Sequence, residues 1–169
     1  MKGYTSIAPA KLDESVFRLI GTDWMLVTAG TKESFNTMTA SWGGLGVLWN
    51  KNVSFIFIRP QRYTFEFVER ADTYTLSFFG EEHRKALQYC GAHSGREVNK
   101  IEKTGLTPAF TDKESVFFAE ARLVLECEKI YWQDLDPAHF LDPDIEKNYS
   151  KGDYHRMYIG EVISCLLKK

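Results

Sequence analysis

The sequence predicts a mainly β, α+β fold in which short helices flank an extended sheet. Short runs rich in β-branched and aromatic residues recur along the chain and end at turn residues, which is typical of strands. Helical periodicity, by contrast, is confined to short segments. Residues 23–59 hold consecutive extended runs, whereas a doubly wound sheet requires strands that alternate regularly with helices. The doubly wound alternative is therefore disfavoured.

Composition narrows the class of protein. A chain of 169 residues with 44% hydrophobic and 14% aromatic residues is long enough for one domain with a real core, and we expect residues 1–169 to form that domain. The net charge of −2 argues against nucleic-acid binding. No apolar run is long enough to span a membrane, and the start of the chain lacks a secretory signal. Three cysteines without a C-x-x-C motif indicate free thiols and a cytoplasmic protein.

The first part of the chain predicts a helix and a hairpin. Apolar residues recur at helical spacing in residues 11–20, so a helix is expected to begin near Asp13 and to end at Gly21. The runs DWMLVTAG (residues 23–30) and SFNTMTASW (residues 34–42) alternate in polarity around the turn residues TKE. This pattern predicts two antiparallel strands.

The rest of the chain alternates short helices with longer extended runs. GGLG, residues 43–46, is expected to let the chain turn tightly. Helical spacing predicts helices in residues 62–72, 80–91 and 96–105, the second closed by Gly91. The predicted strands are residues 52–58, 73–79, 117–132 and 153–167.

A long acidic segment separates the last two strands. Its aspartates are spaced as in a calcium-binding loop that starts at Asp134, but His139 stands where that loop needs glycine and Ile145 where it needs glutamate. A calcium site is therefore not predicted. We expect instead an ordered surface loop that is pinned to the body by the apolar side chains Phe140, Leu141, Ile145 and Tyr149.

A candidate anion site follows the strand of residues 52–58. Arg59 ends that strand, and Arg62 and Thr64 lie at the start of the next helix. A helix N-terminus carries a partial positive charge and free N–H groups, and arginine donates bidentate hydrogen bonds to phosphate. The alternative, which these residues alone leave open, is a pair of solvated arginines with Thr64 as a helix N-cap.

The stretch FNTMTASWGG adds a second candidate site. Alternation along a strand places Thr37, Thr39 and Ser41 on one face and Asn36, Met38, Ala40 and Trp42 on the other. A small hydrogen-bonding face beside a bulky apolar one suits a flat heteroaromatic ring, although an ordinary strand with a solvent-facing Thr/Ser row would show the same alternation. With an anion site one strand away, the two stretches together predict a phosphorylated flat cofactor.

Four segments in order resemble the flavin reductase-like, FMN-binding split-barrel family, which includes the flavoredoxins. They are NTMTASW, IRPQRYTFEFV, CGAHSGREVNK and GDYHRMYIGEV, and the resemblance covers nearly the whole chain. It implies a six-stranded Greek-key split β-barrel with short flanking helices. It also implies a homodimer with FMN in a groove at the subunit interface.

The resemblance implies roles for particular residues. The isoalloxazine ring would be lined by Asn36, Thr37, Met38, Thr39, Ala40, Ser41 and Trp42. The phosphate would be held by Arg59, Arg62, Tyr63 and Thr64, with Ser94 and Lys100 near the ring or the phosphate tail. His155 would lie near the ring or an incoming nicotinamide and is the predicted catalytic residue; its ordinary pKa of about 6.5 would let it donate a hydrogen bond in either protonation state.

The function implied is that of an FMN-dependent oxidoreductase, an NAD(P)H-dependent flavin reductase that transfers hydride to the flavin. Its electrons would go to a flavin-dependent monooxygenase or another redox protein. The chain has no G-x-G-x-x-G motif, so the nicotinamide would dock directly over the flavin. The alternative is a flavoredoxin-type electron carrier or a flavin-binding module without NAD(P)H turnover. A metal site is not predicted, because His83, Cys90 and His93 lack a second pair at zinc spacing.

Overall fold

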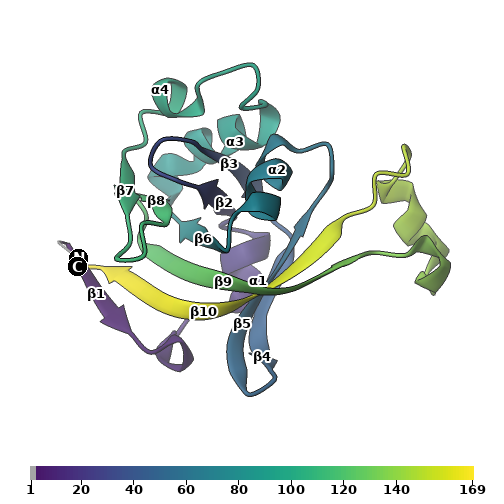
Figure 1. Cartoon of the computed structure of the whole chain (residues 1–169), viewed down its shortest axis with the longest axis horizontal. Helices are drawn as coiled ribbons and strands as arrows, with labels where there is room; N and C mark the ends of the chain where they lie inside the picture. The colour runs from purple at the N-terminus through teal and green to yellow at the C-terminus, as the bar shows by residue number, and fades with distance from the viewer. Residues whose placement is uncertain (1–2) are drawn as a thin grey trace.

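The computed structural model describes residues 3–169, which form a large antiparallel sheet with helices packed around it (Figure 1). The main sheet has eight strands where the family resemblance implied six. Seven follow the order β3-β2-β6-β9-β10-β5-β4, and β1 pairs with the end of β10. The strands are β1 (Tyr4–Ile7), β2 (Met25–Gly30), β3 (Phe35–Ala40), β4 (Gly43–Leu48), β5 (Lys51–Ile58), β6 (Thr73–Phe78), β9 (Leu123–Asp134) and β10 (Arg156–Lys168). A second, two-stranded sheet pairs β7 (Pro108–Phe110) with β8 (Val116–Phe118).

The sheet is a split barrel. Strands β3 and β4 are the two ends of the strand order, yet only Ser41 and Trp42 separate them in the chain. The sheet must therefore curl back on itself, and it stays open between these two edges. The hairpin of residues 23–30 and 34–42 is confirmed as β2 and β3, but β3 ends at Ala40, so Ser41 and Trp42 lie in the connection.

Residues 43–46, predicted as a tight turn, belong instead to strand β4. At Gly44 a Cβ would only touch the Phe55 ring of β5, at 3.5 Å, but at Gly43 it would lie 2.7 Å from the Phe55 carbonyl oxygen. Glycine inside a strand often marks such a close approach. The hairpin turns at Trp49 and Asn50, both with positive φ (51° and 59°), as in the type I′ turns that join twisted strands.

Four short α-helices surround the barrel: α1 (Val16–Gly21), α2 (Tyr63–Arg70), α3 (Arg84–Ala92) and α4 (Lys100–Thr104). Helix α1 starts later than predicted, because Ser15 and not Asp13 accepts the capping hydrogen bond. Helix α3 continues one residue past Gly91. No helix in residues 3–169 is both long and apolar enough to cross a membrane. The described chain also has short 3-10 helices at η1 (Pro9–Lys11), η2 (Glu81–His83), η3 (Pro137–His139) and η4 (Pro143–Asn148).

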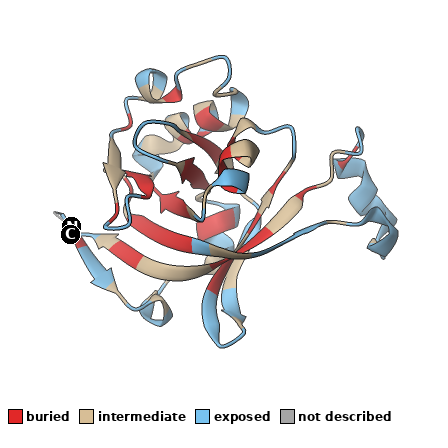
Figure 2. Ribbon diagram, in the orientation of Figure 1, coloured by how far each residue is buried: buried red, intermediate tan, exposed pale blue. Residues whose placement is uncertain are grey.

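Strand β3 is buried on both faces, and this fixes the position of the site. Met38 and Ala40 belong to the core cluster that fills the barrel. On the opposite face, the Thr39 hydroxyl donates to the carbonyl of Leu87 in helix α3. Burial accordingly concentrates in the sheet, while the surrounding helices carry exposed outer faces (Figure 2). One edge of β3 pairs with β2, and its other edge borders the open side of the barrel.

The acidic segment between β9 and β10 projects from the body as an arm (Figure 1). We define the arm as residues 135–154. The expectation that four apolar side chains pin it is wrong for two of them, since Leu141 is 99% exposed and Ile145 is exposed as well. Phe140 and Tyr149 do pack: their rings stack at 5.9 Å, and Tyr149 is buried.

Candidate functional site

The predicted anion site is formed by the start of helix α2. The helix begins after its N-cap residue Arg62, and no side chain caps its first turn. Thr64 is not the N-cap; it is buried inside the first turn, where its hydroxyl accepts a hydrogen bond of 2.7 Å from the Asn36 side-chain amide. An uncapped N-terminus leaves N–H groups available to an anion.

The segment of residues 93–99 forms the opposite wall. Gly95 presses against β3 so closely that a Cβ there would lie 2.0 Å from the Asn36 Oδ1 atom. Arg96 holds the segment in place: its guanidinium lies 4.7 Å from the centre of the Tyr63 ring and forms an ion pair with Glu66. A side chain at position 95 would force Asn36 to move, and the close contact brings Ser94 and Lys100 to the site.

Lys100 is buried, and its charge is not balanced by a carboxylate. Its Nζ atom donates to the carbonyls of Thr37 at 2.7 Å and Cys90 at 2.8 Å. Burial lowers the pKa of Lys100 to about 8, and the positive charge of Arg62 acts in the same direction. Arg62 donates to the Gly91 carbonyl at 2.9 Å. Within residues 3–169 neither cation has a salt-bridge partner, so the site holds two uncompensated positive charges.

Arg59 differs from these two cations. Its guanidinium forms an ion pair of 2.7 Å with Asp153 and donates at 2.7 Å to the carbonyl of Asn148. Both partners lie on the arm. Arg59 lines the site as predicted, but its charge is already balanced by Asp153, which the sequence gave no reason to expect so close.

Three adjoining cavities collect every predicted site residue. A cavity of about 470 Å³ is lined by Asn36, Met38, Arg59, Arg62, Tyr63, Thr64, Ser94 and Lys100. A smaller one of about 210 Å³ is lined by Met38, Thr39, Ala40, Ser41, Trp42, Arg59, Arg62 and His155. Thr37 lines a third cavity of about 670 Å³, which shares Asn36, Tyr63 and Lys100 with the first. Segments far apart in the sequence thus meet along β3.

The Thr37 and Thr39 hydroxyls of β3, which were expected to face a ligand, take part in hydrogen bonds within the protein. The Thr37 and Thr28 hydroxyls share a hydrogen bond of 2.8 Å, and the Thr39 hydroxyl donates to Leu87. These hydroxyls bond to other groups of the protein, because α3 and the loop after it cover that face of the strand. The strand therefore offers a ligand its backbone and the side chains at its end, chiefly Ser41 and the half-exposed Trp42.

His155 is buried at the end of the smaller cavity, 5.3 Å from the Trp42 ring. Its Nδ1 atom lies 2.8 Å from the Tyr149 hydroxyl. Burial lowers the pKa of His155 to about 4, and Arg59 contributes in the same direction. The expectation of an ordinary pKa near 6.5 is therefore wrong, and the imidazole is neutral at physiological pH.

Several residues of the site were missed by sequence reasoning. Gly95 and Phe57 line the cavities, and Tyr149 and Asp153 of the arm support them. The Arg59–Asp153 ion pair joins residues 94 positions apart, a separation that no local pattern reveals. For Gly95 the glycine in SGREV was a usable signal, because glycine is required where a backbone approaches closely.

Comparison with known proteins gives one family and one fold. The model of the flavin reductase like domain matches residues 17–169. A search of curated protein sequences finds no match. Among solved structures, an FMN-binding domain of a flavin reductase-like enzyme from Shewanella baltica superposes with a TM-score of 0.71 at 18% identity, covering 98% of this chain and 77% of that one.

Two further structures share the fold. A flavoredoxin from Methanosarcina acetivorans has a TM-score of 0.68 at 21% identity, covering 96% of this chain and 77% of that one. An NADH:FAD oxidoreductase from Streptomyces globisporus, solved with NAD and FAD fragments, has a TM-score of 0.64 at 18% identity and covers 87% and 81% of the two chains. At such identities the likeness shows the fold alone.

Proposed function

The chain belongs to the flavin reductase like domain family, and on that premise we propose that it binds FMN along β3 and reduces flavin with NAD(P)H. One observation carries the proposal. The uncapped start of helix α2 and two uncompensated cations, Arg62 and Lys100, border the cavity of about 470 Å³. A cavity of this size falls within the range of about 300–1,000 Å³ that is usual for small-ligand sites.

The charge of the site fits a phosphate monoester. Such a group carries a charge of about −1.5 to −2 at neutral pH, and the two uncompensated cations match it. Because Arg59 is balanced by Asp153, we assign the anion to Arg62, Lys100 and the first turn of α2. Arg59 then acts as a wall of the site and not as a phosphate ligand.

The smaller cavity fits a flat ring. Met38, Trp42 and Phe57 supply apolar and aromatic walls, and Ser41 and His155 supply polar groups at the edge. Aromatic and apolar side chains beside a few placed hydrogen-bonding groups are typical of cofactor sites. The anion site is the cavity of about 470 Å³, and the ring site is the cavity of about 210 Å³. The two cavities share Met38, Arg59 and Arg62, so one ligand would occupy both.

Bound flavin would supply the hydride acceptor, and the chain supplies binding and orientation. Met38, Trp42 and Phe57 would pack against the ring. The neutral His155 imidazole orients a carbonyl-bearing partner without adding a charge beside the two arginines. No side chain is required to remove a proton from carbon in a hydride transfer, which agrees with the lack of a carboxylate in the smaller cavity among residues 3–169.

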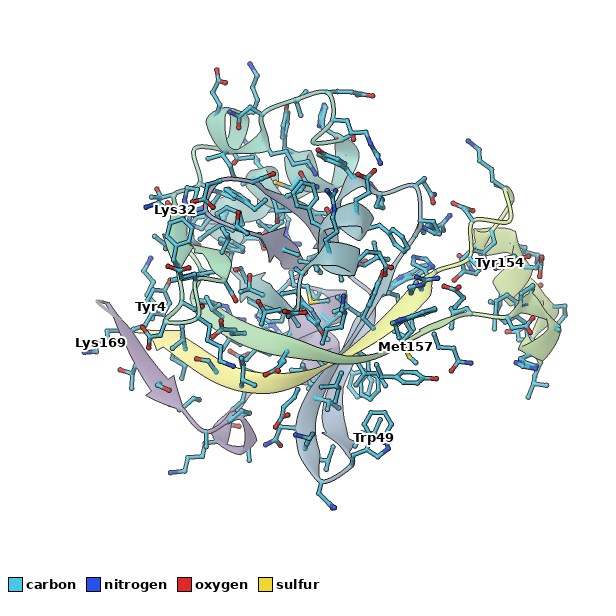
Figure 3. All side chains as sticks on the ribbon, in the orientation of Figure 1. Tyr4, Lys32, Trp49, Tyr154, Met157 and Lys169 are labelled. Atoms are coloured by element: carbon cyan, nitrogen blue, oxygen red, sulfur yellow. The ribbon has the colours of Figure 1, made fainter. Side chains whose placement is uncertain are left out.

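We further propose a homodimer whose second copy covers an aromatic band beside the ring site. Trp49 and Tyr131 are exposed, with their ring centres 5.9 Å apart. Strand pairing extends this band through Met157, which lies opposite Phe57, and Phe57 lines the smaller cavity. Figure 3 shows Trp49 beside the β4–β5 turn. A bulky residue held there at positive φ is uncommon, which supports a role for its exposed ring.

The electron acceptor would be a flavin-dependent monooxygenase or another redox protein. The cytoplasmic location stays a prediction, supported by the three buried free cysteines.

Anaerobic titration tests the proposal. The purified chain should quench the fluorescence of added FMN, and NADH or NADPH should then bleach the absorbance of the bound flavin. If FMN binds but neither nucleotide bleaches it, an electron carrier or a flavin-binding module replaces the reductase. Failure to bind FMN would overturn the proposal as a whole.

A further inference from the structure

Besides the contacts of Asp153 and Asn148 with Arg59, the arm packs against the site through one buried side chain. Every residue from 141 to 152 is exposed except Tyr149, which is 6% exposed. The Arg59 guanidinium lies 5.1 Å from the centre of the Tyr149 ring, and Phe140 stacks on the ring from the arm. Tyr149 therefore packs against the wall of the flavin site while its neighbours in the chain face solvent.

Tyr149 also fixes the orientation of His155. Its hydroxyl lies 2.8 Å from Nδ1, and the two rings meet edge to face at 5.5 Å and 78°. Trp42 packs near the imidazole at 5.3 Å. With its ring between two aromatic side chains and one nitrogen tied to a hydroxyl, the imidazole has little freedom to turn.

The chemistry of the pair decides which nitrogen carries the proton. A phenol is a stronger hydrogen-bond donor than the N–H of a neutral imidazole, and an imidazole nitrogen is a stronger acceptor than a phenolic oxygen. The Tyr149 hydroxyl therefore donates to Nδ1. The partner of one ring nitrogen sets the tautomer of the other, so Nε2 carries the hydrogen.

The Nε2 atom is free to meet a ligand. It has no hydrogen-bond partner within residues 3–169. The only buried and unpaired side-chain N or O atoms in the described chain are Ser77 Oγ and Asp153 Oδ1, so Nε2 is open to solvent-accessible space. His155 lines the cavity of about 210 Å³, and Nε2 can donate a hydrogen bond to a ligand in this cavity.

We propose that Tyr149 is a positioning residue of the flavin site: it holds His155 as the Nε2–H tautomer, so that the cavity offers a neutral donor to a carbonyl oxygen of the ligand. The charged groups around the imidazole are Arg59, Arg62 and Asp153, and its low pKa keeps it neutral beside the two arginines. Anion recognition at Arg62 and Lys100 is thereby separated from carbonyl recognition at His155. The proposal rests on the proposed function only for the identity of the ligand, a flavin or nicotinamide carbonyl.

Nitrogen-15 NMR of the protein without flavin tests the tautomer directly. The chain has four histidines, and His155→Gln assigns the signal of interest by its loss. In the wild type near pH 7 we expect an unprotonated Nδ1 and a protonated Nε2. In Tyr149→Phe, which keeps the ring but removes the hydroxyl, the tautomer ratio should shift by about two- to tenfold, the effect of one neutral hydrogen bond.

Tyr154→Phe is the matched control. Tyr154 lies on the same arm (Figure 3) and packs 4.9 Å from the Tyr149 ring, but its hydroxyl donates to Glu146. It should leave the His155 tautomer unchanged. An Nδ1–H tautomer in the wild type, an unchanged ratio in Tyr149→Phe, or equal shifts in both variants would each overturn the proposal. Because no flavin is present, a failure of FMN binding leaves this result readable.

Discussion

Removal of the Arg62 side chain is the most specific perturbation of the anion site. Arg62 lies at the N-cap of α2, lines both cavities of the proposed FMN site, and within residues 3–169 contacts no carboxylate. A hydrogen bond that involves a charged group contributes about 1.5–3 kcal/mol. Arg62→Ala should therefore raise the Kd for FMN by about tenfold to somewhat over a hundredfold.

Folding should be little affected by the same change. Arg62 is exposed, and its one hydrogen bond goes to the Gly91 carbonyl. Surface substitutions of this kind usually change the free energy of unfolding by no more than about 0.5 kcal/mol. The denaturation midpoint of Arg62→Ala in urea should stay close to that of the wild type.

Fluorescence quenching with two flavins separates phosphate recognition from ring recognition. FMN should lose affinity for Arg62→Ala, whereas riboflavin, which has no phosphate, should bind both proteins alike. Arg59→Ala is the comparison variant. Because Arg59 is already paired with Asp153, its removal should weaken FMN binding less than the removal of Arg62. The reasoning is refuted if Arg62→Ala binds FMN with wild-type affinity, if riboflavin loses as much as FMN, or if Arg59→Ala is the weaker binder.

Three further predictions follow from the site and its surroundings. Burial lowers the pKa of Lys100 to about 8, so the side chain is charged only below that pH. FMN affinity should therefore fall as the pH rises through about 8. Lys100→Met should bind FMN weakly and should lack this pH dependence. An unchanged pH profile in the variant would contradict this role. Gly95→Ala places a Cβ 2.0 Å from the Asn36 Oδ1 atom and should lower the free energy of unfolding in urea by about 1–3 kcal/mol. Gly21→Ala, which has open space around its Cβ, should leave the free energy of unfolding unchanged. In light scattering, Trp49→Glu should convert a dimer of twice 19.5 kDa to a monomer. Phe17→Glu, which changes a ring on α1 that is 92% exposed, should leave the dimer intact. A dimeric Trp49→Glu variant would place the interface elsewhere.

Local patterns in the sequence predicted much of the fold and the membership of the site. Local patterns located β3, β5 and α2, which carry part of the site. Ser94, Lys100 and His155 were reached through the family resemblance. The structure brings their side chains to one set of adjoining cavities. Sequence reasoning was misled in residues 43–46, because glycine is favoured both in a tight turn and where a neighbouring backbone approaches closely, as the Phe55 carbonyl does at Gly43.

Electrostatic roles were less accessible from sequence, because they depend on distant partners. The balance of Arg59 by Asp153 arises from a contact with the arm. The low pKa of His155 arises mainly from burial, with Arg59 acting in the same direction. The internal pairing of Thr37 with Thr28 depends on the register of β2 against β3. Tertiary packing sets each of these features, and residue type alone does not reveal them.

Single-turnover kinetics test the central claim most directly. The FMN-loaded chain would be mixed with NADH or NADPH in an anaerobic stopped-flow instrument, and the decay of the flavin absorbance compared with that of free FMN at the same concentration. The account predicts that the protein accelerates flavin reduction strongly with at least one nucleotide. Bound FMN that is reduced no faster than free FMN by either nucleotide would contradict it.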